Sequence, residues 1–147
     1  MNKEYPEPKI ADRDIEFYKL LVKVEGKDEY MTPHLEKPVS FGEVYTIGNG
    51  REIHYTVDYR KRYVIDEGAF HLLETKEDAD RYFKDTFQHW KSPYWVKAKN
   101  LVLVKAIVPK GTPYVLGNTP NWNRHFYGDD YEPYKSVATL RVRYEKI

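Results

Sequence analysis

The strongest periodic pattern in the chain lies between residues 76 and 90. Apolar residues recur there at steps of three and four, which predicts one face of an α-helix. The stripe consists of Ala79, Tyr82, Phe83, Thr86, Phe87 and Trp90. Thr75 stands before it with Asp78 three residues on, which suits an N-terminal cap, and Pro93 blocks helix beyond Ser92. The sequence therefore predicts one main helix near 76–90.

Segments on both sides of this helix have the patterns of β-strands. Residues 101–108 form a short apolar run rich in branched side chains, which is typical of a central strand covered on both faces. Residues 15–24 predict the first strand, with Phe17 and Leu21 on the same face as Lys19. Residues 69–73 and 112–116 predict further strands, and residues 134–144 predict a closing strand with one solvated face.

A hairpin is expected around Gly48-Asn49-Gly50. These residues lie between two strand-like segments, 43–47 and 51–57, and Asn-Gly favours a two-residue turn with positive φ. The expected register places Val44 opposite Tyr55, on the face that turns toward the core. Pro109-Lys110-Gly111 predicts a second turn, with the proline at its first corner.

Together these elements predict an α+β domain. Its core is a curved, mostly antiparallel sheet, or two small sheets, with one main helix near 76–90. A helix placed between two strands also leaves a parallel crossover open. Residues 1–13 are charged and contain two prolines, so they predict an N-terminal arm, followed by a single domain over 14–147.

Composition narrows the classes of function. The formal charge is +1 with acids and bases interspersed, which argues against general nucleic-acid binding. The chain has no cysteine, so disulfides, thiolate catalysis and cysteine-bound zinc are excluded. No apolar run approaches the roughly 20 residues that span a bilayer, and the first residues lack a signal sequence's apolar segment. We therefore expect a cytoplasmic protein that does not bind membranes.

Aromatic residues mark one candidate site. The chain has 14 tyrosines and 3 tryptophans, and the predicted loop 117–133 carries Trp122, Arg124 and Tyr127. Aromatic rings can stack on a base or sugar, and an arginine can pair with a phosphate. The same loop would equally serve by folding over the sheet and burying its own rings, or by contacting another subunit.

His71 marks a second candidate. It lies on a predicted strand just before the helix start, where free backbone amides favour an anion. The alternative is a structural histidine that is hydrogen-bonded at the sheet edge. Three acids at Asp129, Asp130 and Glu132 lack the surrounding calcium-loop pattern, so they indicate a solvated loop and no metal site.

Two resemblances bear on these residues. The pattern Gly68-x-x-His71, then Glu77-Asp78-Ala79, then residues 107–117 with Pro109-Lys110-Gly111-x-x-Tyr114, resembles small uncharacterised proteins of bacteria and phages. The segment from Gly68 to Tyr82 also distantly resembles ADP-ribosyltransferase-like domains. That resemblance implies two small sheets with an NAD-binding cleft between them.

The second resemblance also implies residue roles. Lys19 stands on the first strand, where such enzymes use a histidine or arginine to hold NAD. The chain lacks their Ser-Thr-Ser strand, and Glu132 and Glu145 are the candidates for the catalytic glutamate by their late position alone.

Two hypotheses of function follow. The first is a non-enzymatic binding protein, without cofactor, for a nucleotide-like ligand or a protein partner, since no acid, base or nucleophile constellation is present. Its ligand-binding residues would be His71, Trp122, Arg124, Tyr127 and Lys19. The alternative is an ADP-ribosyltransferase-like enzyme that uses NAD. The sequence leaves the oligomeric state open.

Overall fold

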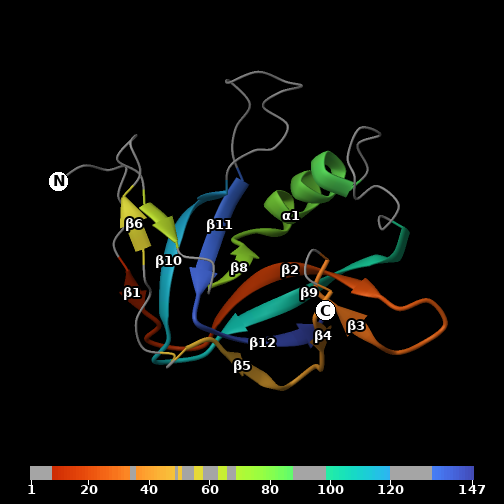
Figure 1. Cartoon of the computed structure of the whole chain (residues 1–147), viewed down its shortest axis with the longest axis horizontal. Coiled ribbons are helices and arrows are strands. Elements are labelled where there is room, and N and C mark those ends of the chain that lie inside the picture. Colours follow the sequence, from red (N-terminus) through yellow and green to blue (C-terminus); the bar gives the residue numbers. More distant parts are fainter. Residues whose placement is uncertain are drawn as a thin grey trace.

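The computed structural model describes residues 8–33, 36–48, 50, 55–57, 63–65, 69–87, 99–119 and 134–147. Across these ranges the protein is a mostly antiparallel sheet with one short α-helix on one side of it (Figure 1). This agrees with the predicted α+β class, although the helix is a smaller part of the fold than expected.

Within the described residues, ten strands form the main sheet in the order β1-β10-β11-β8-β2-β9-β12-β5, with β3 beside β2 and β4 beside β3. Strands β6 and β7 form a separate pair. The bounds are β1 Lys9–Ile10, β2 Ile15–Lys23, β3 Tyr30–Met31, β4 Pro38–Val39, β5 Val44–Thr46, β6 Tyr55–Val57, β7 Tyr63–Ile65, β8 Phe70–Leu73, β9 Leu101–Val108, β10 Pro113–Thr119, β11 Tyr134–Thr139 and β12 Arg141–Lys146.

The two most apolar strand predictions are confirmed, and they form the centre of the sheet. β2 pairs antiparallel with β9 from Ile15 opposite Val108 to Val22 opposite Leu101. β9 also pairs antiparallel with β12 on its other edge. Because β9 has strands on both edges and apolar contacts on both faces, its continuous apolar sequence is the one expected of a central strand.

The sheet is much more sparsely paired where β8 meets β2. The register there contains Tyr18 opposite Leu73 alone, whereas β8 pairs with β11 from Phe70 to Leu73. Both contacts of β2 are antiparallel, so β8 and β9 run in the same direction with β2 inserted between them. The helix therefore belongs to a crossover that passes over β2, which settles the alternative that the sequence leaves open.

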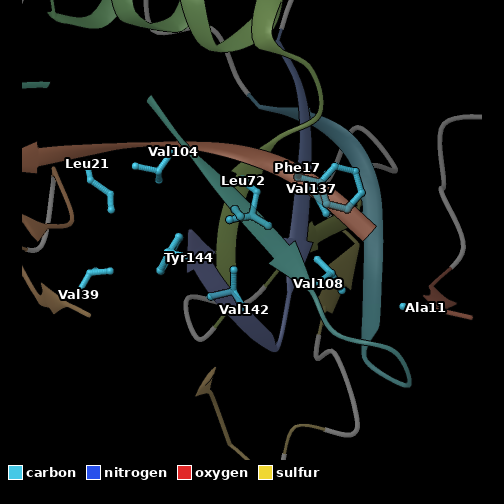
Figure 2. Close-up of a cluster of buried hydrophobic side chains, with 11 residues drawn as sticks. Ala11, Phe17, Leu21, Val39, Leu72, Val104, Val108, Val137, Val142 and Tyr144 are labelled. Carbon is cyan, nitrogen blue, oxygen red and sulfur yellow. The ribbon is translucent and has the colours of Figure 1, made fainter. Parts of the chain in front are cut away.

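The main core lies on one face of the sheet and draws on nearly all of its strands (Figure 2). Leu21 and Phe17 come from β2, Leu72 from β8, Val137 from β11 and Val142 from β12. Leu21 and Val142 are fully buried at 0% exposure. A smaller cluster of Leu73, Ala79 and Tyr134 lies on the other face, beneath the helix.

The helix starts where predicted and changes form early. Thr75 is the N-cap, and its hydroxyl accepts a hydrogen bond from the Asp78 amide at 3.1 Å. α1 spans Lys76–Tyr82 and continues as the π-helix η1 over Phe83–Phe87. Ala79 and Tyr82 of α1 pack in the smaller cluster beneath the helix, while Phe83, the first residue of the π-helix, is half-buried. Residues 88–90 of the predicted helix lie outside the described residues.

The predicted 43–57 hairpin is wrong. β5 pairs with β12, with Thr46 opposite Arg141 and Tyr45 opposite Val142, and β6 pairs with β7. Consequently Tyr45 packs on the core, while Val44 is 40% exposed. Gly50 does have positive φ at 70°, but Gly48 does too, and the Gly50 amide donates a hydrogen bond to the Ile47 carbonyl at this turn. Glycines with positive φ allow the chain to turn here, but they do not determine which strand pairs with β5.

The chain ends and turns also differ in detail from the predictions. Residues 9–10 of the predicted arm form β1 beside β10, and Ala11 is 2% exposed in the core. In the 109–112 turn the Thr112 amide bonds the Pro109 carbonyl and Gly111 has φ of 85°. Pro109 therefore precedes the first corner instead of occupying it. The closing strand is split at Leu140 into β11 and β12.

Candidate functional site

Lys19 is a charged residue in an unusual position in the sheet, among apolar residues of the core face. On β2 it alternates with Phe17 and Leu21, so its side chain starts on the face of the main core. Its partner across the ladder is Val104 of β9, which is 2% exposed. The Lys19 side chain is half-buried. A lysine at this position is unusual because charged groups are seldom buried without a partner.

The partner of the Lys19 ammonium is a backbone carbonyl. Its Nζ donates a hydrogen bond to the carbonyl oxygen of His71 at 2.9 Å. His71 belongs to β8, which pairs with β2 through Leu73 alone. The lysine side chain thus bonds a carbonyl at the point where regular pairing between β2 and β8 has ended.

Electrostatics make this lysine different from its neighbours. Burial lowers the pKa of Lys19 from 10.5 to about 8, because a low-polarity surrounding disfavours the charged form. No carboxylate among the described residues forms an ion pair with it. Lys105, on the adjacent strand β9, pairs with Glu16 at 3.3 Å. Lys19 is therefore a partly desolvated cation whose contact within the described chain is a neutral one.

His71 and Lys19, both predicted as site residues, are brought together by the structure through the His71 backbone. The imidazole is exposed, and strand alternation directs it to the face of Leu73, opposite the face of Lys19. Desolvation and, second to it, the charge of Lys19 lower the pKa of His71. The two residues are electrostatically coupled without forming a direct side-chain pair.

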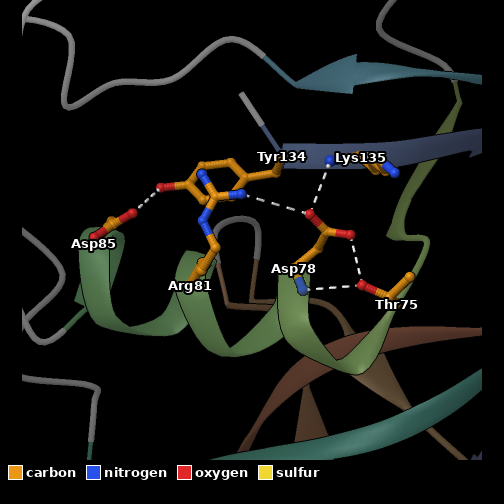
Figure 3. Close-up of polar contacts among 6 residues, drawn as sticks. All are labelled: Thr75, Asp78, Arg81, Asp85, Tyr134 and Lys135. Atoms are coloured by element: carbon orange, nitrogen blue, oxygen red, sulfur yellow. Dashed lines mark hydrogen bonds and ion pairs between the residues drawn. The ribbon is translucent and has the colours of Figure 1, made fainter. Parts of the chain in front are cut away.

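The anion site expected at the helix start beside His71 stays a prediction. The Asp78 carboxylate lies at this helix start (Figure 3): Thr75 Oγ1 donates to its Oδ2 at 2.6 Å and the Lys135 amide donates to its Oδ1 at 3.2 Å. Arg81 approaches the same carboxylate at 3.8 Å. These contacts hold a negative charge in the first turn of the helix, where the helix dipole favours it.

A second group of contacts, which the sequence did not predict, ties the helix to β11. The Tyr134 hydroxyl donates to Asp85 Oδ2 at 2.7 Å (Figure 3). The Arg81 guanidinium lies 5.1 Å from the centre of the Tyr134 ring, and Tyr82 meets that ring edge-on at 5.4 Å. The sequence signal was weak, because Asp85 lies off the apolar stripe and nothing local marks Tyr134 as buried. These contacts explain how a short helix stays docked.

The remaining predicted site residues lie outside the described part of the chain. Trp122, Arg124 and Tyr127 belong to residues 120–133, as do the three acids of the predicted solvated loop. The two ends of that segment are described: Thr119 of β10 pairs with Tyr134 of β11. The Glu74 amide also bonds the Lys135 carbonyl, so the base of the loop adjoins the end of β8.

The described residues contain no group of three or more histidine, cysteine, aspartate or glutamate residues placed to hold a metal ion. In the same ranges no helix has the length and apolar character needed to cross a membrane.

Neither a protein-family model, nor a curated protein, nor a solved structure matches this chain. The resemblances to small bacterial and phage proteins and to ADP-ribosyltransferase-like domains stay predictions from the sequence pattern.

Proposed function

We propose that the protein is a non-enzymatic, cytoplasmic binding protein for a nucleotide-like ligand, with Lys19 holding an anionic group of that ligand. The observation that carries the proposal is the half-buried Lys19 ammonium on the core face, without a carboxylate partner among the described residues. Removing a cation from water is unfavourable unless an opposite charge compensates it. An anionic ligand would provide that charge.

The position of Lys19 supports a ligand with an aromatic base as well. The 120–133 segment connects β10 to β11, and β11 pairs with β8, the strand whose carbonyl Lys19 contacts. That segment contains Trp122, Arg124 and Tyr127, which supply stacking surfaces and a second cation. The exposed His71 imidazole lies on the other face of the sheet from Lys19, so it is left out of this set. A nucleotide combines the base and the anion that such a set would recognise.

The proposal also includes a division of the sheet into two parts. Strands β8, β10 and β11 lie on one side of the Tyr18–Leu73 pair, and β2, β9 and β12 lie on the other. We take these as two small sheets, or the two arms of one curved sheet, with the ligand entering where they part. This is the arrangement that the ADP-ribosyltransferase resemblance implies.

The test is calorimetry with NAD, ADP-ribose and cyclic nucleotides on three forms of the full chain. Lys19→Met should weaken binding about tenfold or more, since a hydrogen bond to a charged group contributes about 1.5–3 kcal/mol. Lys23→Met is the matched control, because Lys23 lies on the same strand with an exposed side chain. Wild type that binds none of these nucleotides at millimolar concentration would defeat the proposal and favour a protein partner.

The alternative is an ADP-ribosyltransferase-like enzyme using NAD, which the place of Lys19 on the first long strand favours. Such an enzyme needs a free glutamate, and Glu145 forms an ion pair with Arg143 at 2.9 Å. Glu132 lies outside the described residues. Release of nicotinamide from NAD by wild type, lost in Lys19→Met and retained in Lys23→Met, would favour the enzyme.

A further inference from the structure

We infer that the Lys19 amine is a site of reversible imine formation with small aldehydes or ketones. The inference goes beyond the proposed function, because it concerns the neutral amine and requires neither a nucleotide nor an anion. It rests on where the side chain lies, what surrounds it and how it can be reached.

The surroundings of Lys19 are those of a nucleophilic lysine. Its neighbours on the core face of β2 are Phe17 and Leu21, and its cross-strand neighbour is Val104; all three are buried. Lysines become nucleophiles when an apolar site or a nearby cation favours loss of the proton. Among the described residues no carboxylate opposes that loss by pairing with Lys19.

The hydrogen bond that Lys19 Nζ makes within the described residues is compatible with the reaction. A neutral amine has two N–H donors and one lone pair, and the His71 carbonyl at 2.9 Å accepts one donor. This contact orients the nitrogen without occupying its lone pair. The residue is half-buried, so its side chain is not fully enclosed.

The chemistry balances without any oxidant or reductant. The Nζ lone pair attacks the carbonyl carbon, a C–N bond forms, and the carbonyl π electrons move to oxygen. Transfer of a proton from nitrogen to that oxygen gives a carbinolamine. Loss of one water molecule then leaves the C=N bond, and addition of water reverses the sequence.

The fraction of Lys19 that is neutral near pH 7.5 also favours imine formation. With a pKa of about 8, roughly a quarter of Lys19 is neutral at pH 7.5, compared with about a thousandth of an ordinary lysine. A less basic amine is also a weaker nucleophile, which offsets part of this advantage. We expect a net rate advantage of about tenfold.

The experiment is brief reductive methylation of the intact protein with formaldehyde and cyanoborohydride at pH 7.5, with each lysine followed by peptide mass spectrometry. Lys19 should be methylated about tenfold faster than Lys105, the half-buried lysine of the next strand that is paired with Glu16. In 6 M urea this advantage should vanish. A Lys19→Arg variant should lose the fast-reacting site and keep the reactivity of Lys105.

A Lys19 rate equal to or below that of Lys105 in the folded wild type would overturn the inference. Persistence of the advantage in urea would overturn it too, because the reactivity would then not come from the fold. Formaldehyde carries no charge, so either failure leaves the nucleotide proposal standing. Conversely, absence of nucleotide binding leaves this result unaffected.

Discussion

The two edges of β2 are held in opposite ways. Toward β9 the strand is paired from Ile15 to Val22, and apolar side chains cover both faces. Toward β8 it makes one pair, Tyr18 with Leu73, and the Lys19 side chain bonds the His71 carbonyl close by. The regular edge uses backbone hydrogen bonds and apolar burial, whereas the sparse edge uses a charged side chain.

The two edges of β2 therefore have different roles: the edge toward β9 stabilises the fold, and the edge toward β8 carries the candidate chemistry. Regular pairing leaves no backbone group free between the two strands. Where pairing is sparse, a carbonyl is available and a lysine can approach it, at the expense of desolvating its charge. The same strand therefore anchors the core on one edge and presents a perturbed amine on the other.

The largest effect should come from the regular edge. Leu21→Ala removes a fully buried side chain from the main core, and we expect a loss of about 2–5 kcal/mol in the free energy of unfolding. Urea denaturation measures it. Val44→Ala is the control, because Val44 is 40% exposed and should change stability by less than about 0.5 kcal/mol. Equal losses in the two variants would mean that the core is assigned wrongly.

A smaller loss is expected where the helix docks on β11, the strand next to β8. Tyr134→Phe keeps the buried ring but removes the hydroxyl that donates to Asp85 at 2.7 Å. Hydrogen bonds to charged groups contribute about 1.5–3 kcal/mol, and the partly buried carboxylate would lose one. Urea denaturation measures this loss too. Tyr45→Phe is a comparison, because its hydroxyl contacts are exposed; if it proves as damaging, the special role of Tyr134 is refuted.

The subtlest effect concerns pH and Lys19 itself. The pKa of Lys19 is lowered on folding from 10.5 to about 8, so the unfolded chain binds more protons between these values. Stability should therefore rise with pH across that window, by up to about 2 kcal/mol between pH 7.5 and 9.5. Comparing urea midpoints of wild type and Lys19→Met at both pH values isolates this contribution, because the variant should lack it. An identical pH dependence in both proteins would show that Lys19 titrates normally.

What could be predicted from the sequence was mostly local. The apolar run 101–108, the alternation of 15–24 and the Thr75 cap each depend on residues close together in the chain, and each proved correct. The 43–57 hairpin failed because the partner of β5 is β12, almost a hundred residues away. Two left-handed glycines at 48 and 50 are compatible with either partner.

In the candidate site, too, local features could be predicted from the sequence and contacts between distant residues could not. Alternation with Phe17 and Leu21 assigned Lys19 to their face of β2 from the sequence alone, and the ADP-ribosyltransferase resemblance singled it out. Its contact with His71 depends on where β8 leaves β2, and no local pattern encodes that point. The expected anion at the helix start stays a prediction, whereas the bond from the Lys135 amide to the Asp78 carboxylate joins residues far apart in the sequence and could not be read from the local pattern.

The insertion of β2 between β8 and β9 has a consequence for how the chain folds. β2 comes early in the sequence, yet its main partner β9 follows it by some ninety residues, from Ile15 to Val108. Closing so long a loop is entropically costly before the contact is made, and topologies dominated by such distant pairs fold slowly. During synthesis β2 must wait, with its apolar Phe17 and Leu21 uncovered, until the ribosome has delivered β9. The central pair of the sheet can therefore form only after most of the chain has been made, although one of its two strands is among the first.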